Sequence, residues 1–269
     1  MITGLARADG ADIAFNVRGE GPSTVLLVMG LAGRSGDWGE PFPSALARHH
    51  RVITFDNRGT GKSTHAPGPY TLRSMARDAI AVLDEVDVDR AHVLGISMGG
   101  MIAQQIAISH RDRVDRLVLI STHGGGPRVV APSREVMALL TPNPAMRGRD
   151  QVRARMIGIT APGFAERRPE VIDELVRIAV AEPTPLRSFI AQLGAILASD
   201  RSDRLSEIVA PTLVVHGDRD PLIPYANGHI LAEAIPNARL ATLKGCGHLP
   251  MWEACAELTG AIEEFLRPA

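Results

Sequence analysis

Lysine is nearly absent from this chain of 269 residues: only Lys62 and Lys244 occur among its 29 cationic residues. With 30 acidic residues the formal net charge is −1, which offers no basic surface for nucleic acid or an anionic membrane. Cysteine is equally scarce, and Cys246 and Cys255 make neither a disulfide framework nor a metal site. The chain has no run of about 18 apolar residues and no basic, then apolar, N-terminal stretch. We therefore expect a soluble, cytoplasmic protein with no nucleic-acid or membrane partner.

The residues that are present alternate between two patterns. Short apolar runs predict strands, and segments with apolar residues on one face predict helices. The hydrophobic share of 45% is enough to bury a sizeable core. Alternation at this rhythm predicts an α/β fold, with a mostly parallel, doubly wound sheet of about eight strands and helices on both faces. The expected strands are a hairpin in 1–18 and the runs 23–30, 51–56, 91–96, 113–122, 210–217 and 238–243.

The alternation stops at His123, after the sixth expected strand. From there to about Arg204 no strand-like run occurs, and proline and glycine separate helical pieces. A segment this long between two sheet strands indicates a lid or a small helical insertion. We therefore predict a core of residues 1–122 and 205–269 and a helical cap of residues 123–204. The helical pieces are 132–140, 150–159, 169–181 and 185–198.

Residues 91–101, AHVLGISMGGM, combine a buried strand, a sharp turn and the start of a helix. Gly95, Ser97 and Gly99 spell G-x-S-x-G in the context that a nucleophile elbow requires. The glycines leave room for a serine on strained, positive-φ backbone, and the turn pushes the hydroxyl out of the sheet. The alternative is a glycine-rich turn that happens to contain a serine.

A serine nucleophile needs a base to take its proton and a carboxylate to orient that base. Asp220 follows one later strand and His248 follows the next, in the order serine, acid, histidine. Asp218 is the alternative acid, whereas Asp56 precedes the serine and breaks the order. His248 could instead be a loop histidine bonded to backbone, and His123 is its competitor as base.

The oxyanion of an acyl-transfer intermediate needs two N–H donors aimed at one point. The first candidate is Met98 N–H, directly after the serine. The second is Leu31 N–H, after Gly30 at the end of a strand that should neighbour the elbow. The alternative for residues 29–33 is an ordinary glycine-rich turn.

Five motifs together resemble those of the α/β-hydrolase fold family over essentially the whole chain. They are VMGLAGRSGDW, DNRGTGKS, GISMGG, HGDRDPLIP and GCGHLPMWE. The resemblance implies a triad of Ser97, Asp220 and His248, with Leu31 as the second oxyanion donor. Two positions depart from the family pattern: Met29 stands where the oxyanion loop usually has histidine, and Cys255 where proline is common. The LLVMG stretch is similar to methylesterases of the aclacinomycin methylesterase type.

These observations predict a serine hydrolase of a small to medium, mostly apolar ester or lactone, acting through an acyl-enzyme on Ser97. One alternative is another reaction on the same triad, such as carbon–carbon hydrolysis, and a second is a low-turnover ligand receptor. The mechanism requires no metal or organic cofactor. The sequence leaves open whether the protein forms a homo-oligomer. The expected substrate-binding residues are Gly30, Trp38, His123, Met137, Met156, Leu222 and Ile223.

Cys246 lies two residues before His248. Because of this proximity, we expect thiol reagents to lower the activity.

Overall fold

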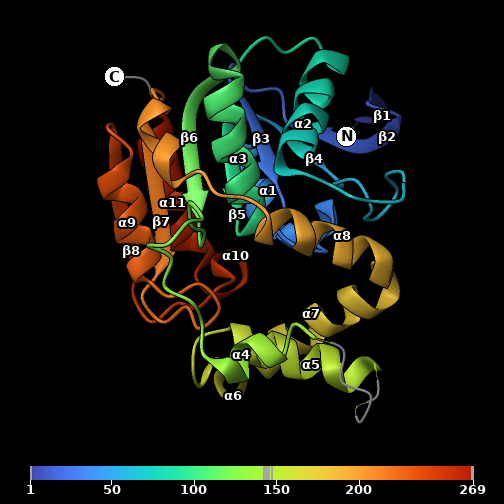
Figure 1. Cartoon of the computed structure of the whole chain (residues 1–269), viewed down its shortest axis with the longest axis vertical. Helices are drawn as coiled ribbons and strands as arrows, with labels where there is room; N and C mark the ends of the chain where they lie inside the picture. Colours follow the sequence, from blue (N-terminus) through green and yellow to red (C-terminus); the bar gives the residue numbers. More distant parts are fainter. Residues whose placement is uncertain (1, 142–145, 147, 268–269) are drawn as a thin grey trace.

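Strands form where aliphatic and β-branched residues follow one another without a polar interruption. In the computed structural model, which describes residues 2–141, 146 and 148–267, eight such runs make one sheet (Figure 1). Every residue of the two strands β5 and β7 is buried, as expected for parallel strands covered on both faces. The strands are β1 (Ile2–Ala8), β2 (Ala11–Arg18), β3 (Thr24–Val28), β4 (Arg51–Phe55), β5 (Ala91–Ile96), β6 (Val114–Ile120), β7 (Thr212–Gly217) and β8 (Ala238–Leu243).

The strand order is β1-β2-β4-β3-β5-β6-β7-β8. The pairs β1/β2 and β2/β4 are antiparallel and the remaining pairs are parallel, which confirms the predicted sheet. The chain reverses its direction of winding between β3 and β5, where Val28 pairs with Gly95. In sheets of this type, ligands bind at the carboxyl ends of the strands beside such a switch point.

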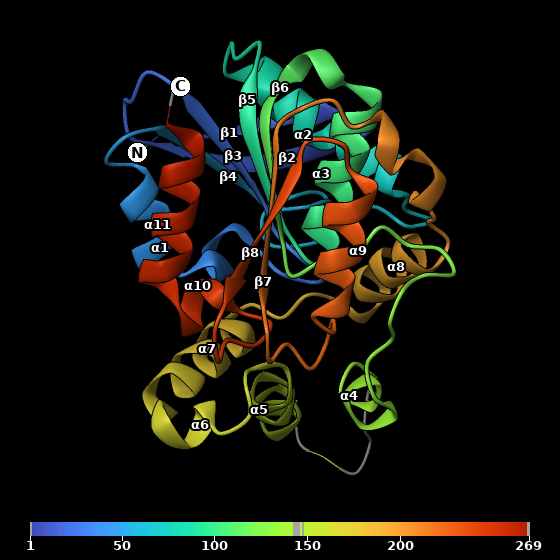
Figure 2. The same ribbon diagram turned by 90° about the vertical axis from the view of Figure 1, so that its left-hand side faces the viewer.

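Helices cover both faces of the sheet, as Figure 2 shows. On one face α2, α3 and α9 pack on a large apolar cluster, and on the other α1 and α11 enclose a second one. After β8 the chain forms two helices, one on each side of Ala254. The core helices are α1 (Pro41–Leu46), α2 (Leu72–Glu85), α3 (Met98–Ser109), α9 (Ala226–Ala234), α10 (Pro250–Glu253) and α11 (Cys255–Leu266), with 3₁₀ helices η1 (Ser35–Trp38) and η2 (Arg111–Arg113).

The described residues between β6 and β7 form helices and loops and contain no strand. Both views place α4 to α7 beyond the carboxyl ends of the parallel strands (Figures 1 and 2). A third apolar cluster, centred on Phe164 and Ile172, gives this segment a small core of its own. We keep the name cap for residues 123–204, and the boundaries of this division stay a prediction. Its elements are α4 (Arg134–Ala138), α5 (Gly148–Ile159), α6 (Phe164–Arg167), α7 (Pro169–Ala181), α8 (Leu186–Leu197) and the start of η3 (Ser202–Glu207).

None of the helices in the described part of the chain combines the length and the apolar character that crossing a membrane requires.

Candidate active site

Ser97 lies at the turn between β5 and α3, with φ 56° and ψ −122°. This left-handed backbone is rare for a residue with a side chain and holds the serine at the tip of the turn. The turn is tight because two glycines let backbones meet: a Cβ on Gly95 would lie 2.2 Å from the Gly99 carbonyl oxygen, and one on Gly99 would lie 2.0 Å from that of Val28. The local sequence therefore forces the elbow by steric exclusion.

Asp220 and His248 come together although 28 residues separate them. His248 Nδ1 lies 2.9 Å from Asp220 Oδ2, and both side chains are almost completely buried. Asp220 Oδ1 accepts the backbone N–H groups of Leu222, at 2.9 Å, and Ile223, at 2.8 Å. A carboxylate can only accept here, so Nδ1 carries the proton, and Nε2 of a neutral ring is free to accept another.

Burial alone would raise the pKa of Asp220, but the charge of His248 and hydrogen bonds from His216 and His248 lower it to about 2. Asp220 is therefore ionised at neutral pH. His216 Nε2 donates to Ile223 O at 2.8 Å and lies 3.5 Å from Asp220 Oδ2. The carboxylate thus has a fixed place between two imidazoles.

The alternative acids have other partners. Asp218 Oδ1 accepts Gly245 N–H at 2.7 Å, which joins two neighbouring turns. Asp56 accepts Ser35 N–H at 2.7 Å and Lys62 N–H at 2.9 Å. Of the three aspartates considered from the sequence, Asp220 is the one that the structure brings to His248.

Among the hydrogen bonds of the described residues, none joins Ser97 Oγ to His248 Nε2. Such bonds are often long without substrate and tighten in the complex. Ser97 keeps partial exposure, and Thr122 Oγ1 donates to its carbonyl oxygen at 2.7 Å.

The two expected oxyanion donors belong to segments that adjoin Ser97. Met98 is the first residue of α3, so its N–H has no acceptor within the helix. A Cβ on Gly30 would lie 3.2 Å from Ser97 Cβ, which places the Gly30–Leu31 peptide beside the serine. Gly30 O accepts Gly33 N–H at 3.2 Å, and in a trans peptide Leu31 N–H then points the opposite way.

Glu253 organises the loop that carries His248, and sequence reasoning assigned it no role. Its Oε2 accepts the N–H groups of Gly247, at 2.9 Å, and of Ala161 in the cap, at 2.8 Å, while Oε1 accepts Leu249 N–H at 3.0 Å. Burial raises the pKa of Glu253 in spite of these bonds. The quoted motif GCGHLPMWE ends on this residue, and that ending was the available signal.

The expected substrate-binding residues separate into different places. Trp38 has no exposed surface and stacks on Phe42, with ring centroids 5.5 Å apart, in the core cluster under α1. A side chain without accessible surface cannot line an open pocket, so the expectation for Trp38 is corrected. The reason is that the chain turns into η1 directly after the glycine-rich loop, and this turn carries Trp38 into the apolar cluster that α1 covers.

The remaining expected residues lie near strand ends or in the cap. Gly30 lies against Ser97, and Leu222 and Ile223 bind Asp220 through their backbones. Met156 packs on the small apolar core of the cap, whereas Met137 in α4 is 42% exposed.

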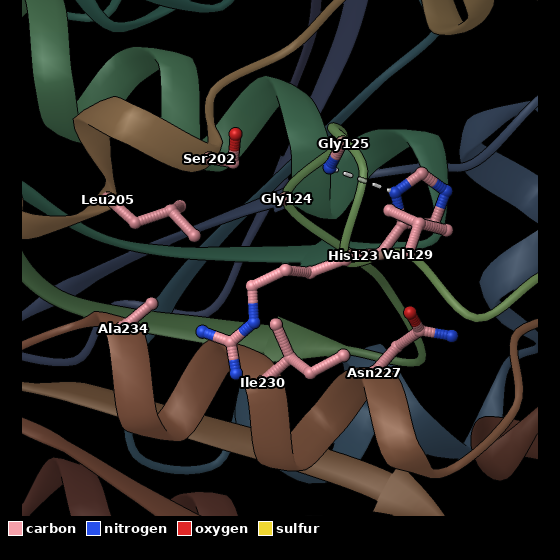
Figure 3. Close-up of a pocket in the computed structure, with 10 residues that line it drawn as sticks. His123, Gly124, Gly125, Val129, Ser202, Leu205, Asn227, Ile230 and Ala234 are labelled. Atoms are coloured by element: carbon pink, nitrogen blue, oxygen red, sulfur yellow. Dashed lines mark hydrogen bonds between the residues drawn. The ribbon is translucent and has the colours of Figure 1, made fainter.

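His123 lies at one end of a small cavity of about 30 Å³ between the loop after β6 and α9 (Figure 3). Its Nδ1 accepts Gly125 N–H at 3.1 Å. Burial, with a smaller contribution from the Arg201 charge, lowers the pKa of His123 to about 4. His123 is therefore neutral at pH 7, and among the hydrogen bonds of the described residues none joins it to Ser97 or Asp220.

Cys246 is 2% exposed, and burial raises the pKa of its thiol. A buried, protonated thiol reacts slowly. The structure therefore gives no support to the expected sensitivity to thiol reagents. The described residues also contain no group of three or more histidine, cysteine or acidic side chains that could hold a metal ion.

The fold and this constellation define a member of the α/β-hydrolase family. The model of the alpha/beta hydrolase family matches residues 25–261. The chain therefore belongs to that family and is a hydrolase. It is 32% identical, over 90% of both chains, to RutD of Azorhizobium caulinodans, which is described as a candidate carbamate hydrolase.

Two further similarities bear on the chemistry. The chain is 30% identical to 2-hydroxy-6-oxononadienedioate/2-hydroxy-6-oxononatrienedioate hydrolase of Cupriavidus pinatubonensis, over 93% of this chain and 89% of that one. The structure of the enol-lactonase from Burkholderia xenovorans superimposes with a TM-score of 0.85 and 27% identity, over 98% of this chain and 99% of the other.

Proposed function

We propose that the protein is a serine hydrolase that cleaves a carboxylic ester or lactone through an acyl-enzyme on Ser97. The observation that carries the proposal is the buried Asp220–His248 pair at the same sheet edge as a serine on left-handed backbone. The N–H groups of Leu31 and Met98 complete an acyl-transfer site.

The proposed reaction has two steps. Ser97 Oγ attacks the carbonyl carbon while His248 Nε2 takes the hydroxyl proton, and the Leu31 and Met98 N–H groups bind the oxyanion. His248 then gives this proton to the leaving alkoxide, which departs as the alcohol and leaves an ester on Ser97. Water attacks that ester with His248 again as base, and the acid is released as His248 gives the proton to Ser97 Oγ.

Asp220 has one role throughout. It holds the imidazole with the proton on Nδ1 and stabilises the positive charge that His248 carries in each transition state. Because the pKa of Asp220 is lowered to about 2, this carboxylate stays charged over the working pH range of a histidine base.

The proposed substrate is a small to medium, mostly apolar ester or lactone. Similarity to an enol-lactonase over nearly the whole chain supports this class. The apolar residues of the cap, which include the exposed Met137, are consistent with a mostly apolar ligand.

A second candidate is hydrolysis of a carbon–carbon bond on the same residues. The relative from Cupriavidus pinatubonensis favours it, because the substrate in its name is an unsaturated oxo diacid and not an ester. In that reaction the leaving group is a carbanion equivalent, which needs a proton on carbon.

The proposal is tested by mixing the protein with p-nitrophenyl acetate and butyrate and following p-nitrophenol release from the first milliseconds. We expect a burst equal to the enzyme concentration, an acyl adduct on Ser97 by mass spectrometry, and neither in Ser97→Ala. Turnover should fall by at least about a thousandfold in that variant. An acyl adduct on another residue, or an unchanged burst in Ser97→Ala, would contradict the proposal. If wild type shows no adduct but hydrolyses an unsaturated oxo diacid, the second candidate replaces the first.

A further inference from the structure

Ala32, in the loop after β3, is bound on both sides by side chains of the cap. Its N–H donates to Gln192 Oε1 at 2.8 Å, and its carbonyl oxygen accepts Thr184 Oγ1 at 2.8 Å. Ala32 has φ 60°, a left-handed conformation that a residue with a Cβ adopts only when its surroundings hold it there. The two cap side chains lie 152 and 160 residues away along the chain and supply that hold.

Gln192 is completely buried in α8, and its amide has only one workable orientation. Oε1 faces the Ala32 N–H, while Nε2 donates to Arg58 O at 3.0 Å. The loop that offers this carbonyl is itself fixed, because the Arg58 guanidinium forms a buried ion pair with Asp78. Gln192 therefore joins the loop after β3 to an anchored part of the core.

This contact decides which N–H groups of the loop are available. Ala32 N–H is used by Gln192, whereas the preceding peptide directs Gly30 O to Gly33 and Leu31 N–H to the opposite side. The Gly30–Leu31 peptide lies between two restrained points, because Asn57 Nδ2 donates to Met29 O on one side and Gln192 binds Ala32 N–H on the other. Without the bond to Gln192 the chain at Leu31 and Ala32 is released, and the Gly30–Leu31 peptide that carries the Leu31 N–H is free to turn. The orientation of the Leu31 donor thus depends on the Ala32 bond.

We propose that Gln192 is a positioning residue of the oxyanion hole, through which the cap holds the Leu31 N–H beside Ser97. This inference rests on the proposed function, since it assigns Leu31 to the oxyanion. It also explains how the loop is held with Met29 in place of the usual histidine. Asn57 Nδ2 donates to Met29 O at 2.9 Å from the core side, and Gln192 and Thr184 hold Ala32 from the cap side.

A neighbouring contact of the same kind supports the inference. Arg34 Nη2 donates to Ile178 O at 2.7 Å, and the same guanidinium forms an ion pair with Glu182. Both acceptors belong to the end of α7 and the turn after it. The loop after β3 is therefore attached to the cap at Ala32 and again two residues later.

The test uses a fluorophosphonate, which labels an active serine without knowledge of the substrate. His248 takes the hydroxyl proton, Ser97 Oγ bonds to phosphorus, fluoride leaves, and the phosphoryl oxygen occupies the oxyanion hole. Gln192→Leu removes both hydrogen bonds at similar volume. We expect its second-order labelling rate, and kcat for a p-nitrophenyl ester, to fall about ten- to a hundredfold. KM should stay within about twofold of wild type, because ground-state binding does not need the oxyanion donor.

Two further variants separate positioning from general damage to the cap. Ser188→Ala is the matched control: Ser188 lies one turn earlier in α8, is buried, and its Oγ makes no hydrogen bond within the described residues. We expect wild-type labelling. Thr184→Val removes only the bond to Ala32 O and should slow labelling about threefold to tenfold, so it replaces Gln192→Leu if that variant does not fold.

The outcomes distinguish the two proposals. If wild type is not labelled at Ser97, the proposed function fails. If wild type is labelled and a folded Gln192→Leu, judged by its melting temperature, reacts at the wild-type rate, only the role of Gln192 is overturned. That role is also overturned if Ser188→Ala loses as much rate as Gln192→Leu, because the effect then comes from disturbing α8.

Discussion

Two kinds of loop meet at the candidate active site, and they are held in different ways. The nucleophile loop is fixed within the core: Ser97 N–H donates to Ile120 O at 2.9 Å, and Gly99 packs on the Val28 carbonyl. The oxyanion loop and the histidine loop are fixed across the boundary with the cap. Gln192 binds Ala32, and Ile159 O accepts His248 N–H at 3.0 Å.

The difference lies in the physics of the contacts. Backbone-to-backbone contacts at glycine are steric and leave no tolerance, because neither partner can move aside. The attachments to the cap are hydrogen bonds, from the Gln192 side chain to Ala32 and between the His248 and Ile159 backbones, and each contributes only about 0.5–1.5 kcal/mol and can be exchanged. The core therefore specifies where the serine lies, and the cap adjusts the groups that act on it. Variants in each kind of loop test this division.

The largest effect should come from breaking the core-held loop with Gly99→Ala. The added Cβ would lie 2.0 Å from Val28 O, so β3 and α3 must separate. We expect a loss of more than about 3 kcal/mol in the free energy of unfolding, together with loss of serine labelling. Urea unfolding followed by circular dichroism measures the change in the free energy of unfolding.

Gly260→Ala is the control for Gly99→Ala, since a Cβ there meets nothing within 4 Å. In the interior of α11 it should stabilise the protein by about 0.5–1 kcal/mol. If both variants are equally stable, the elbow is not set by steric exclusion.

Acid should weaken the core that supports the nucleophile loop. His92 lies in β5, is 7% exposed, and burial lowers its pKa to about 4. The unfolded chain therefore binds a proton on this imidazole near pH 6.5, and the folded protein binds it only near pH 4. The contribution of the neutral His92 to the free energy of unfolding is therefore complete above pH 6.5 and is lost as the pH falls from 6.5 to 4. The loss for this residue is on the order of 3 kcal/mol.

Urea midpoints between pH 7 and pH 4 measure this loss, and His92→Phe should show a flatter pH dependence. An identical slope in the variant and in wild type would mean that His92 is not the group responsible.

A smaller effect is expected in the cap-held histidine loop for Glu253→Gln. The amide keeps one oxygen but turns an NH₂ group toward a backbone N–H, so at least one of three bonds is lost. Activity should fall about tenfold. Stability should change little, because burial that raises the pKa of Glu253 makes its charge costly and removing the charge offsets the lost bonds.

Glu257→Gln, on an exposed position of α11, is the control for Glu253→Gln. Steady-state kinetics and melting temperatures of the two variants give the answer. Equal activity of the two variants would show that the histidine loop does not need the three hydrogen bonds of the Glu253 carboxylate.

The parts of the molecule that local pattern specifies could be predicted from the sequence. The eight strands, the sheet type and the helices around Ser97 follow from apolar periodicity and from G-x-S-x-G, because each depends on neighbours a few residues away. The order of Ser97, Asp220 and His248 could be read in the same way, since each follows a strand.

Contacts across the cap could not be predicted. Gln192 reads as one polar residue on an amphipathic helix, and its partner lies 160 residues earlier in the chain. Glu253 is likewise an ordinary helical glutamate until the histidine loop folds over it. The prediction for Trp38 was wrong because it relied on local sequence alone. An aromatic residue beside a glycine-rich loop suggests a ligand-binding position, but the turn into η1 buries Trp38 completely.

The uneven attachment of the cap has a consequence for the route by which a ligand arrives. None of the five described residues of α4 is buried, whereas α8 buries Gln192 and two others. Displacing α4 uncovers little apolar surface, but displacing α8 breaks the contacts to Ala32. We therefore expect ligand to enter and product to leave beside α4. Movement of α4 can then open the site while the contacts between α8 and the oxyanion loop stay in place.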